Sequence, residues 1–472
     1  MNILQVNTAY HQGGAAMVAA NLQRRYQALG HHAWMAVGHT TQKHSDVFVI
    51  PNEPPAPTAP PLQPRHTFRG FAQRIIRRLG LNPHSGRMQA SLRRQSEPGY
   101  EDFDFPGTRM LLDLPPAEPD ILHCHNLHGD YFDLRLLPQL SAKLPVICNL
   151  HDAWMLAGHC AHSFDCERWR NGCGACPDLT IPPAIPVDRS AENWQRKAAI
   201  YRASRLHVTT PSRWLMQKVK ASMLAPALQS ARVIPNGVDM QWFKPGNKIA
   251  ARRALNLPED DLILMFAANG IKGNVWKDIA TLRDCLARLT PPAGRQLRLL
   301  ALGETSAPEQ VGQATISYVP HVSSPDRMAS YYQATDFYVH AARADTFPNV
   351  VIEALACGTP VAATAVGGIP EQIRSLHVPG TAHDQQAWPA ESATGLLTPR
   401  DPIALATALN YILDKPDLIA MLAANAARDA AARFDLDRQV AALLTWYEEI
   451  LSEAPSLETA DPSSPHILPP RL

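Results

Sequence analysis

The chain has 472 residues, of which 46% are hydrophobic, so it can bury more than one core and two domains are expected. Its 44 basic and 43 acidic residues leave a net charge of +1, which gives no reason to expect a nucleic-acid partner. No apolar run reaches the length needed to span a bilayer, and the first strand is too short for a signal peptide. The sequence therefore predicts a cytoplasmic protein, and a location at the inner face of the membrane is an alternative.

The first elements form a strand, turn, helix and strand. Residues 2–8 have the pattern of a short buried strand, and residues 9–14 ("AYHQGG") read as a turn. Helical apolar spacing follows until Gly30, and "AWMAVG" at 33–38 is a second strand. This order is typical of a βαβ unit and indicates a parallel, doubly wound sheet.

Two unusual segments interrupt this alternation. Residues 51–64 hold seven prolines and predict an irregular loop. Residues 65–94 hold eight arginines and no acid, and their large apolar residues recur near helical spacing. That pattern suits peripheral contact with an anionic membrane surface, although an ordinary solvated helix would show it too.

Strands and helices then alternate in two successive blocks of about two hundred residues each, which predicts two Rossmann-like domains. Dinucleotide dehydrogenases also contain two such blocks, but G-x-G-x-x-G is missing after the first strand. This counts against a dinucleotide cofactor. The chain ends in a helical pattern at 437–452 and a proline-rich tail at 453–472, which we expect to be disordered.

Two carboxylates lie eight positions apart in "RADTFPNVVIEALACGTPVA". Asp345 follows a strand and Glu353 lies in the next helix, whose start is fixed by Pro348. Backbone N–H groups of Asn349 and Val350 at the helix start favour a phosphate, while the acids can accept hydrogen bonds from a sugar and a ribose. The alternative is a loop acid and a solvent-exposed helix acid.

The downstream segment "TAVGGIPEQI" favours the ligand interpretation. Gly367 and Gly368 again follow a strand and allow a close backbone approach. Ligands of open α/β sheets bind beyond the carboxyl ends of the strands. Two neighbouring strand ends are therefore expected to converge on one site.

The run "DTFPNVVIEALACGTPVAATAVGGIPE" resembles the donor-site signature of the family 4 (group 1) retaining glycosyltransferases, which have the GT-B fold. "NTAYHQGGAA", "VIPNGVDMQWFKP" and "DLDRQVAALLTWYEEIL" are similar to other segments of that family, in the same order. The resemblance implies an α/β protein with two Rossmann-like, doubly wound domains facing across a cleft. It divides the chain into an acceptor-side domain at 1–215, a donor-binding domain at 216–436 and a closing helix at 437–452.

The resemblance also implies roles for individual residues. Those nearest the chemistry are His151, Asp345 and Lys277. Those expected to bind the nucleotide sugar are Gly13, Gly14, Lys272, Phe347, Pro348, Asn349, Val350 and Glu353. Asp345 replaces the family's usual glutamate, and the basic residue that normally precedes the lysine has no clean counterpart beyond Lys272 or Asn269.

By resemblance, the chain transfers a sugar from a UDP- or GDP-sugar to a glycan or lipid-linked acceptor, in cell-surface polysaccharide biosynthesis. Retention by front-face attack is implied, and no metal is expected for catalysis. A catalytically impaired sugar-nucleotide-binding or regulatory subunit is a second interpretation, motivated by Asp345 and the missing basic residue. An epimerase or phosphorylase on the same fold is a third.

A cysteine-rich insertion at 158–178 contains four thiols in C-x5-C-x6-C-x2-C spacing. Cysteines of this number and spacing can bind a structural zinc ion, and His159 or His162 could replace one of them. Packed thiols or disulfides are the alternatives. The insertion resembles one found in a polysaccharide-biosynthesis subgroup of these transferases. The predicted zinc ligands are Cys160, Cys166, Cys173 and Cys176.

Three histidines lie at the end of the predicted strand "DILHCHN" (120–126) and just beyond it, in "HCHNLHGDYFDL": His123, His125 and His128. No carboxylate with clear ligand spacing accompanies them, so metal binding is disfavoured. We expect them to line the acceptor cleft or to form hydrogen bonds within it.

Overall fold

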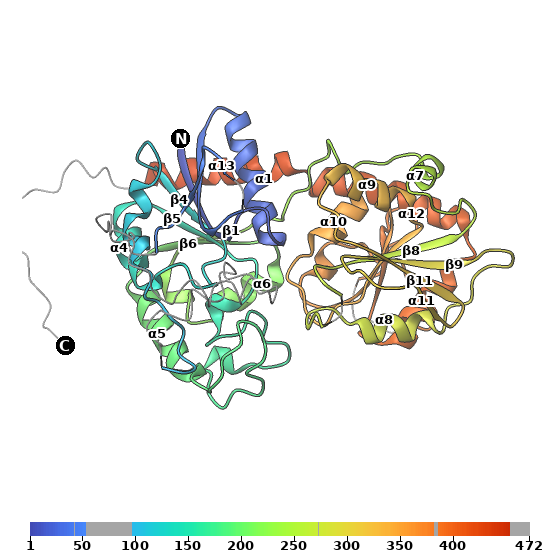
Figure 1. Cartoon of the computed structure of the whole chain (residues 1–472), viewed down its shortest axis with the longest axis horizontal. Helices are drawn as coiled ribbons and strands as arrows, with labels where there is room; N and C mark the ends of the chain where they lie inside the picture. Colours follow the sequence, from blue (N-terminus) through green and yellow to red (C-terminus); the bar gives the residue numbers. More distant parts are fainter. Residues whose placement is uncertain (42, 53–96, 272, 382–385, 454–472) are drawn as a thin grey trace, which may run out of the picture.

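The computed structural model contains two α/β domains side by side, each built around a seven-stranded sheet (Figure 1). It describes residues 1–41, 43–52, 97–271, 273–381 and 386–453. The basic segment 65–94, most of the proline-rich loop, Lys272 and the tail from 454 lie outside the described residues. None of the described helices is long and apolar enough to cross a membrane.

The first sheet is parallel throughout and has the order β3-β2-β1-β4-β5-β6-β7. Its strands are β1 (Asn2–Ala9), β2 (His32–His39), β3 (Val47–Val49), β4 (Ile121–Cys124), β5 (Val146–Asn149), β6 (Leu206–Thr210) and β7 (Leu228–Val233). Strands such as β4 and β5 are buried along their whole length, because helices and loops cover both faces of a parallel sheet.

The first domain's helices are α1 (Gly14–Ala28), α4 (Leu137–Lys143), α5 (Ser190–Arg202) and α6 (Arg213–Lys220). Short 3-10 helices join them at Pro106–Asp113, Leu134–Leu136, Trp154–Leu156, Arg168–Arg170 and Ala225–Ala227. A large apolar core lies on one face of the sheet and a second lies between the other face, α1 and α13 (Leu436–Glu453).

The second sheet has the order β10-β11-β9-β8-β12-β13-β14, and only the pairing of β10 with β11 is antiparallel among its described strands. The strands are β8 (Leu262–Ala267), β9 (Leu297–Leu302), β10 (Glu309–Val311), β11 (Ala314–Val319), β12 (Phe337–His340), β13 (Val361–Thr364) and β14 (Gly395–Thr398). Its helices are α7 (Lys248–Ala254), α8 (Ile279–Leu286), α9 (Pro325–Ala334), α10 (Asn349–Ala356), α11 (Pro402–Ile412), α12 (Pro416–Arg433) and the 3-10 turn Ile369–Glu371.

The chain crosses between the domains twice, and the two crossings lie against each other. Val238 exchanges backbone hydrogen bonds with Phe434 and Leu436, at 2.7 and 3.0 Å. A Cβ on Gly237 would lie 2.4 Å from the Cα of Leu436, so this close contact requires glycine. Beyond the second crossing, α13 packs its apolar face on α1 and β1 of the first domain (Figure 1).

In each sheet, the strand order reverses beside the first strand of its domain. The reversal lies between β1 and β4 in the first sheet and between β8 and β12 in the second. Ligands of doubly wound sheets bind at such switch points, outside the carboxyl ends of the strands. The residues that follow these four strands are therefore the first place to look for a functional site.

Candidate functional site

A charged cluster joins the carboxyl ends of β8 and β12. The Oδ2 atom of Asp345 accepts a hydrogen bond from Nζ of Lys277 at 2.7 Å and lies 3.4 Å from Nε2 of His340. Lys277 Nζ also lies 3.2 Å from this histidine nitrogen. A backbone bridge between Lys277 and Ala342 holds the two segments together. The structure thus brings two predicted site residues, 68 positions apart, into direct contact.

The electrostatics of this cluster fix its charge state. Burial disfavours the charged form of Asp345, but the Lys277 charge and the hydrogen bond with His340 outweigh it and lower the pKa of Asp345. Burial, with the nearby Lys277 charge, lowers the pKa of His340 to about 4. At neutral pH Asp345 is therefore a carboxylate and His340 a neutral imidazole.

The double glycine after β13 packs directly under the Asp345 loop. Gly368 donates its N–H to the carbonyl of Asp345 at 3.1 Å. A Cβ on Gly367 would lie 1.8 Å from that carbonyl oxygen, and one on Gly368 would lie 1.9 Å from the carbonyl oxygen of Thr346. Glycine is needed here because any larger residue would push the loop away.

The start of α10 faces the glycine loop of the first domain. Asn349 Nδ2 donates to the carbonyl of Gly14 at 3.4 Å, and Asn236 Nδ2 donates to Asn349 Oδ1 at 3.0 Å. The first N–H groups of a helix have no intrahelical acceptor, and no side chain caps this helix at Asn349 and Val350. Gly13 precedes Gly14 in the left-handed region, with φ of 91°. Uncapped amides therefore lie beside the glycine loop of the first domain.

Phe347 and Pro348 anchor the loop that leads into α10. The ring of Phe347 is buried against Phe434, with centroids 5.8 Å apart. The carbonyl of Pro348 accepts a hydrogen bond from Gln372 Nε2 at 3.0 Å. The side chain of Phe347 thus holds the loop in place, and only the backbone of this segment is left to contact a ligand.

Glu353 lies one turn inside α10. Its Oε2 atom accepts a hydrogen bond from the hydroxyl of Tyr332 at 2.9 Å. Burial raises the pKa of Glu353 to about 7, although the Tyr332 hydrogen bond opposes the shift. A solvent-exposed helix acid would show neither feature, so that alternative is wrong.

His151 brings the first domain to the same site. Its carbonyl accepts a hydrogen bond from Thr346 Oγ1 at 2.6 Å, and Thr346 is the residue that follows Asp345 in the chain. Its Nε2 atom lies 2.9 Å from Nδ1 of His125. Burial lowers the pKa of His151 to about 4, so its imidazole is neutral. The hydrogen bond between Thr346 and His151 therefore brings His151 of the first domain close to the Asp345 loop of the second.

Two arginines at this edge were not predicted from the sequence. A cavity of about 760 Å³ lies beside Lys277, and its lining includes Arg343 and Arg400. Arg343 also stacks over the ring of Phe164 from the cysteine-rich insertion, at 5.0 Å. Arg343 comes two positions before Asp345, and Arg400 follows β14, so their positions after strands could have identified them. They bring further positive charge to the cavity beside Lys277, where Arg400 also lies 3.9 Å from Asp278.

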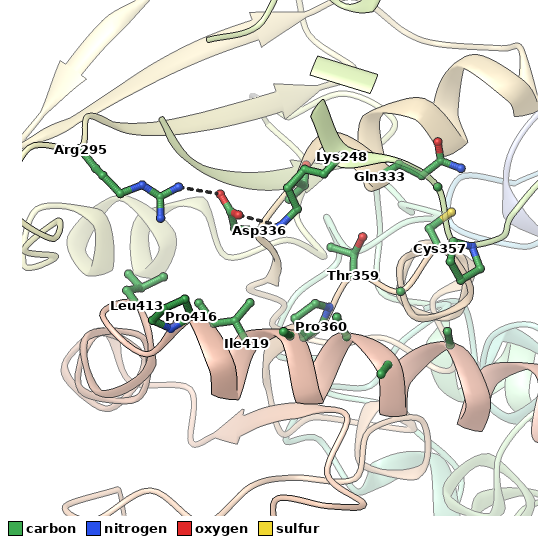
Figure 2. Close-up of a pocket in the computed structure, with 18 of the residues that line it drawn as sticks. Lys248, Arg295, Gln333, Asp336, Cys357, Thr359, Pro360, Leu413, Pro416 and Ile419 are labelled. Atoms are coloured by element: carbon green, nitrogen blue, oxygen red, sulfur yellow. Dashed lines mark hydrogen bonds and ion pairs between the residues drawn. The ribbon is translucent and has the colours of Figure 1, made fainter. Parts of the chain in front are cut away.

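A second cavity, of about 490 Å³, lies at the amino ends of β12 and β13 (Figure 2). Figure 2 shows Lys248 and Arg295 directed at Asp336 from two sides, and Lys248 Nζ lies 2.8 Å from its carboxylate. The buried Arg252 contacts Asp336 as well, at 2.7 Å. These cations are used in a structural ion-pair cluster, so the cavity at the carboxyl edge is the better candidate.

The predicted zinc site is not formed. Within the described part of the chain, no three His, Cys, Asp or Glu side chains are close enough to hold a metal ion. The thiol of Cys176 lies 3.3 Å from Nε2 of His159, and the sulfur of Cys173 accepts the N–H of Gly158. Residues 172–175, which include Cys173, all have positive φ. Cys160 and Cys166 are free thiols too.

The three histidines in and after β4 have separate partners. His123 is fully buried and its Nδ1 atom bonds to the hydroxyl of Tyr447 at 2.7 Å, so it does not line a cleft. His125 is buried too and contacts His151. His128 forms an ion pair with Asp152 at 2.9 Å, which raises its pKa against the effect of burial.

Comparisons with known proteins agree with this arrangement. Residues 262–415 match the family model described as Glycosyl transferases group 1. The chain is 26% identical over 382 residues to the putative colanic acid biosynthesis glycosyl transferase WcaC of Escherichia coli K12, covering 77% of this chain and 83% of that protein. It is 29% identical over 243 residues to the D-inositol 3-phosphate glycosyltransferase of Saccharomonospora viridis, covering 48% and 52%. The match thus spans about half the length of that relative.

Solved structures show the same fold. Sucrose-phosphate synthase from Thermosynechococcus elongatus aligns with a TM-score of 0.60 at 18% identity, over 96% of this chain and all of that one. HepE from Anabaena, solved with UDP and glucose, aligns with a TM-score of 0.55 at 15% identity, over 95% of this chain and all of that one. The predicted GT-B architecture is confirmed.

Proposed function

We propose that this chain is a group 1 glycosyltransferase and that it moves a sugar with retention from a nucleoside-diphosphate sugar to a glycan or lipid-linked acceptor. The carrying observation is the Asp345–Lys277 pair at the switch point of the second sheet, opposite the Gly13–Gly14 loop. The colanic acid relative supports an acceptor of the polysaccharide class, and the UDP-bound likeness supports a UDP-sugar.

The proposed chemistry needs few protein groups. The leaving diphosphate takes the bonding electron pair from the anomeric carbon, and Lys277, Arg343 and the uncapped α10 amides stabilise its growing charge. The acceptor hydroxyl attacks from the same face, and its proton passes to the departing phosphate oxygen. Asp345 accepts hydrogen bonds from the sugar, and Glu353 accepts them from the ribose.

The binding-only interpretation was motivated by Asp345 and by a missing basic residue. Arg343 and Arg400 bring positive charge to the same cavity as Lys277, which removes that second motive. An epimerase or phosphorylase remains distinguishable because it would react without a glycan acceptor.

The test is a panel of UDP- and GDP-sugars. We expect one donor to raise the unfolding temperature, and expect nucleoside diphosphate release to depend on an added acceptor. Replacing Glu353 with alanine should weaken donor binding several-fold, as for a lost hydrogen-bonding carboxylate. Donor binding without release across all acceptors would contradict the enzyme proposal, and unchanged affinity in the variant would contradict the ribose role.

A further inference from the structure

A row of three polar side chains leads from the interior of the first domain to the cleft. Gln5 lies in β1, His125 follows β4 and His151 follows β5. His125 Nε2 lies 3.0 Å from Gln5 Oε1, and His125 Nδ1 lies 2.9 Å from His151 Nε2. Gln5 and His125 are almost completely buried, so each polar atom in this row needs a partner of the right kind.

The orientation of Gln5 is set by α1. Its Nε2 atom donates to the backbone carbonyl of Ala19 at 3.2 Å. A carbonyl can only accept, so the amide oxygen of Gln5 must face His125. Since that oxygen also only accepts, Nε2 of His125 must carry a hydrogen.

The hydrogen on His125 Nε2 decides which nitrogen of His151 carries a hydrogen. Burial and the neighbouring His123 and His151 lower the pKa of His125, so it is neutral and carries one proton, on Nε2. Its Nδ1 atom is then a lone-pair acceptor, and the hydrogen of the 2.9 Å contact belongs to Nε2 of His151. A neutral His151 consequently has a lone pair on Nδ1.

We propose that Gln5 and His125 are positioning residues that hold His151 in its Nε2-protonated tautomer, so that His151 Nδ1 accepts a hydrogen bond from a sugar hydroxyl. The contact with a sugar depends on the proposed function, whereas the tautomer of His151 does not. The Thr346 contact keeps His151 beside the Asp345 loop. Among the described residues, Nδ1 has no hydrogen-bond partner and is not fully buried, so it is free to meet a ligand. With a pKa of about 4, His151 binds a hydroxyl rather than removing its proton.

Nitrogen NMR of the full chain labelled with ¹⁵N-histidine tests the tautomer near neutral pH, and His151→Gln assigns the signals. In the wild type, Nδ1 of His151 should give a non-protonated signal. In Gln5→Glu, a carboxylate faces His125 and favours its imidazolium, whose Nδ1–H then donates to His151. His151 Nδ1 should therefore become protonated. A protonated Nδ1 in the wild type, or an unchanged signal in Gln5→Glu, would overturn the proposal.

Tyr447→Phe is the matched control, because it removes a hydrogen bond to His123 in the same core without touching this row. It should leave the His151 signals unchanged; a tautomer switch there would count against the proposal. With UDP-glucose as the probe, Gln5→Glu should raise KM about tenfold with little change in kcat, as expected for one lost hydrogen bond. Should Gln5→Glu fail to fold, Gln5→Met removes the acceptor and should mix the two tautomers. If UDP-glucose is not used, the NMR result stands while the proposed function fails for that donor.

Discussion

The two strand edges that face the cleft differ in charge although they share one topology. The first domain presents a glycine loop and the neutral imidazole of His151. The second presents an ionised Asp345 paired with Lys277, and a cavity lined by Lys277 and two arginines. Buried charges are tolerated only when paired, and Asp345 with Lys277 forms such a pair.

This difference separates the tasks of the two domains. A diphosphate that gains charge in the transition state needs cations and helix amides, and these lie in the second domain. In the proposed function the sugar hydroxyls meet two acceptors, the ionised Asp345 of the second domain and the neutral His151 of the first. Loss of the cations in the second domain should therefore impair kcat, whereas changes in the first domain should act mainly on binding.

The largest effect should come from Lys277→Met. Loss of its charge should lower kcat about 100-fold or more, as for other groups that stabilise a leaving anion. Nucleoside diphosphate release measures it. Lys248→Met is the control, because Lys248 pairs with Asp336 at a similar distance on the opposite edge. Equal losses in both variants would show a general folding defect and contradict the role of Lys277.

An unpaired Asp345 would itself destabilise Lys277→Met, since a lone buried charge is costly. The double variant Lys277→Met, Asp345→Asn removes both charges. It should regain thermal stability without regaining activity. Recovery of activity would mean that the pair is structural.

Arg343→Ala should have a smaller effect, about tenfold on kcat/KM, because Lys277 and Arg400 remain in the cavity. Steady-state kinetics with the donor found in the panel measures it. Arg170→Ala offers a match, since Arg170 also stacks on an aromatic ring, at 4.9 Å from the centroid of Trp169. An activity equal to wild type in Arg343→Ala would contradict a role for Arg343 and leave Lys277 and Arg400 as the cations of the cavity.

Glu353 gives a smaller, pH-dependent effect. Its pKa of about 7 means that the carboxylate forms as pH rises through neutrality, and only that form accepts two hydrogen bonds from a diol. Donor affinity should rise several-fold across this range. Glu353→Gln, which resembles the protonated form, should bind at the low-pH level throughout. A parallel rise in Glu353→Gln would assign the pH dependence to another group.

The sequence predicted local features well, because their causes are local. Strand patterns and a Pro348-fixed helix start located Asp345 and Glu353, and the glycine pair after β13 was correctly expected to approach a backbone closely. The pairing of Asp345 with Lys277 depends on which strands are neighbours, and β8 lies beside β12 only after the sheet has formed.

The failures have the same physical origin. Cysteine spacing suggested zinc, but spacing does not give the distances between side chains, and the described thiols form no group that could hold a metal ion. His123 was expected at the cleft, yet α13 returns from the second domain and buries it against Tyr447. A contact between positions 324 apart leaves no local signal.

The smallest effect should follow metal removal. A structural zinc ion contributes directly to folding free energy, so chelation of a real site would lower the unfolding temperature. The described thiols form no metal-binding group, and the insertion is instead fixed by contacts such as Trp276 with His162 and Phe164. We therefore expect EDTA to leave the unfolding temperature unchanged, while Trp276→Ala lowers it. A chelator-sensitive transition together with a full equivalent of bound zinc would contradict this expectation and return the four cysteines to a ligand role.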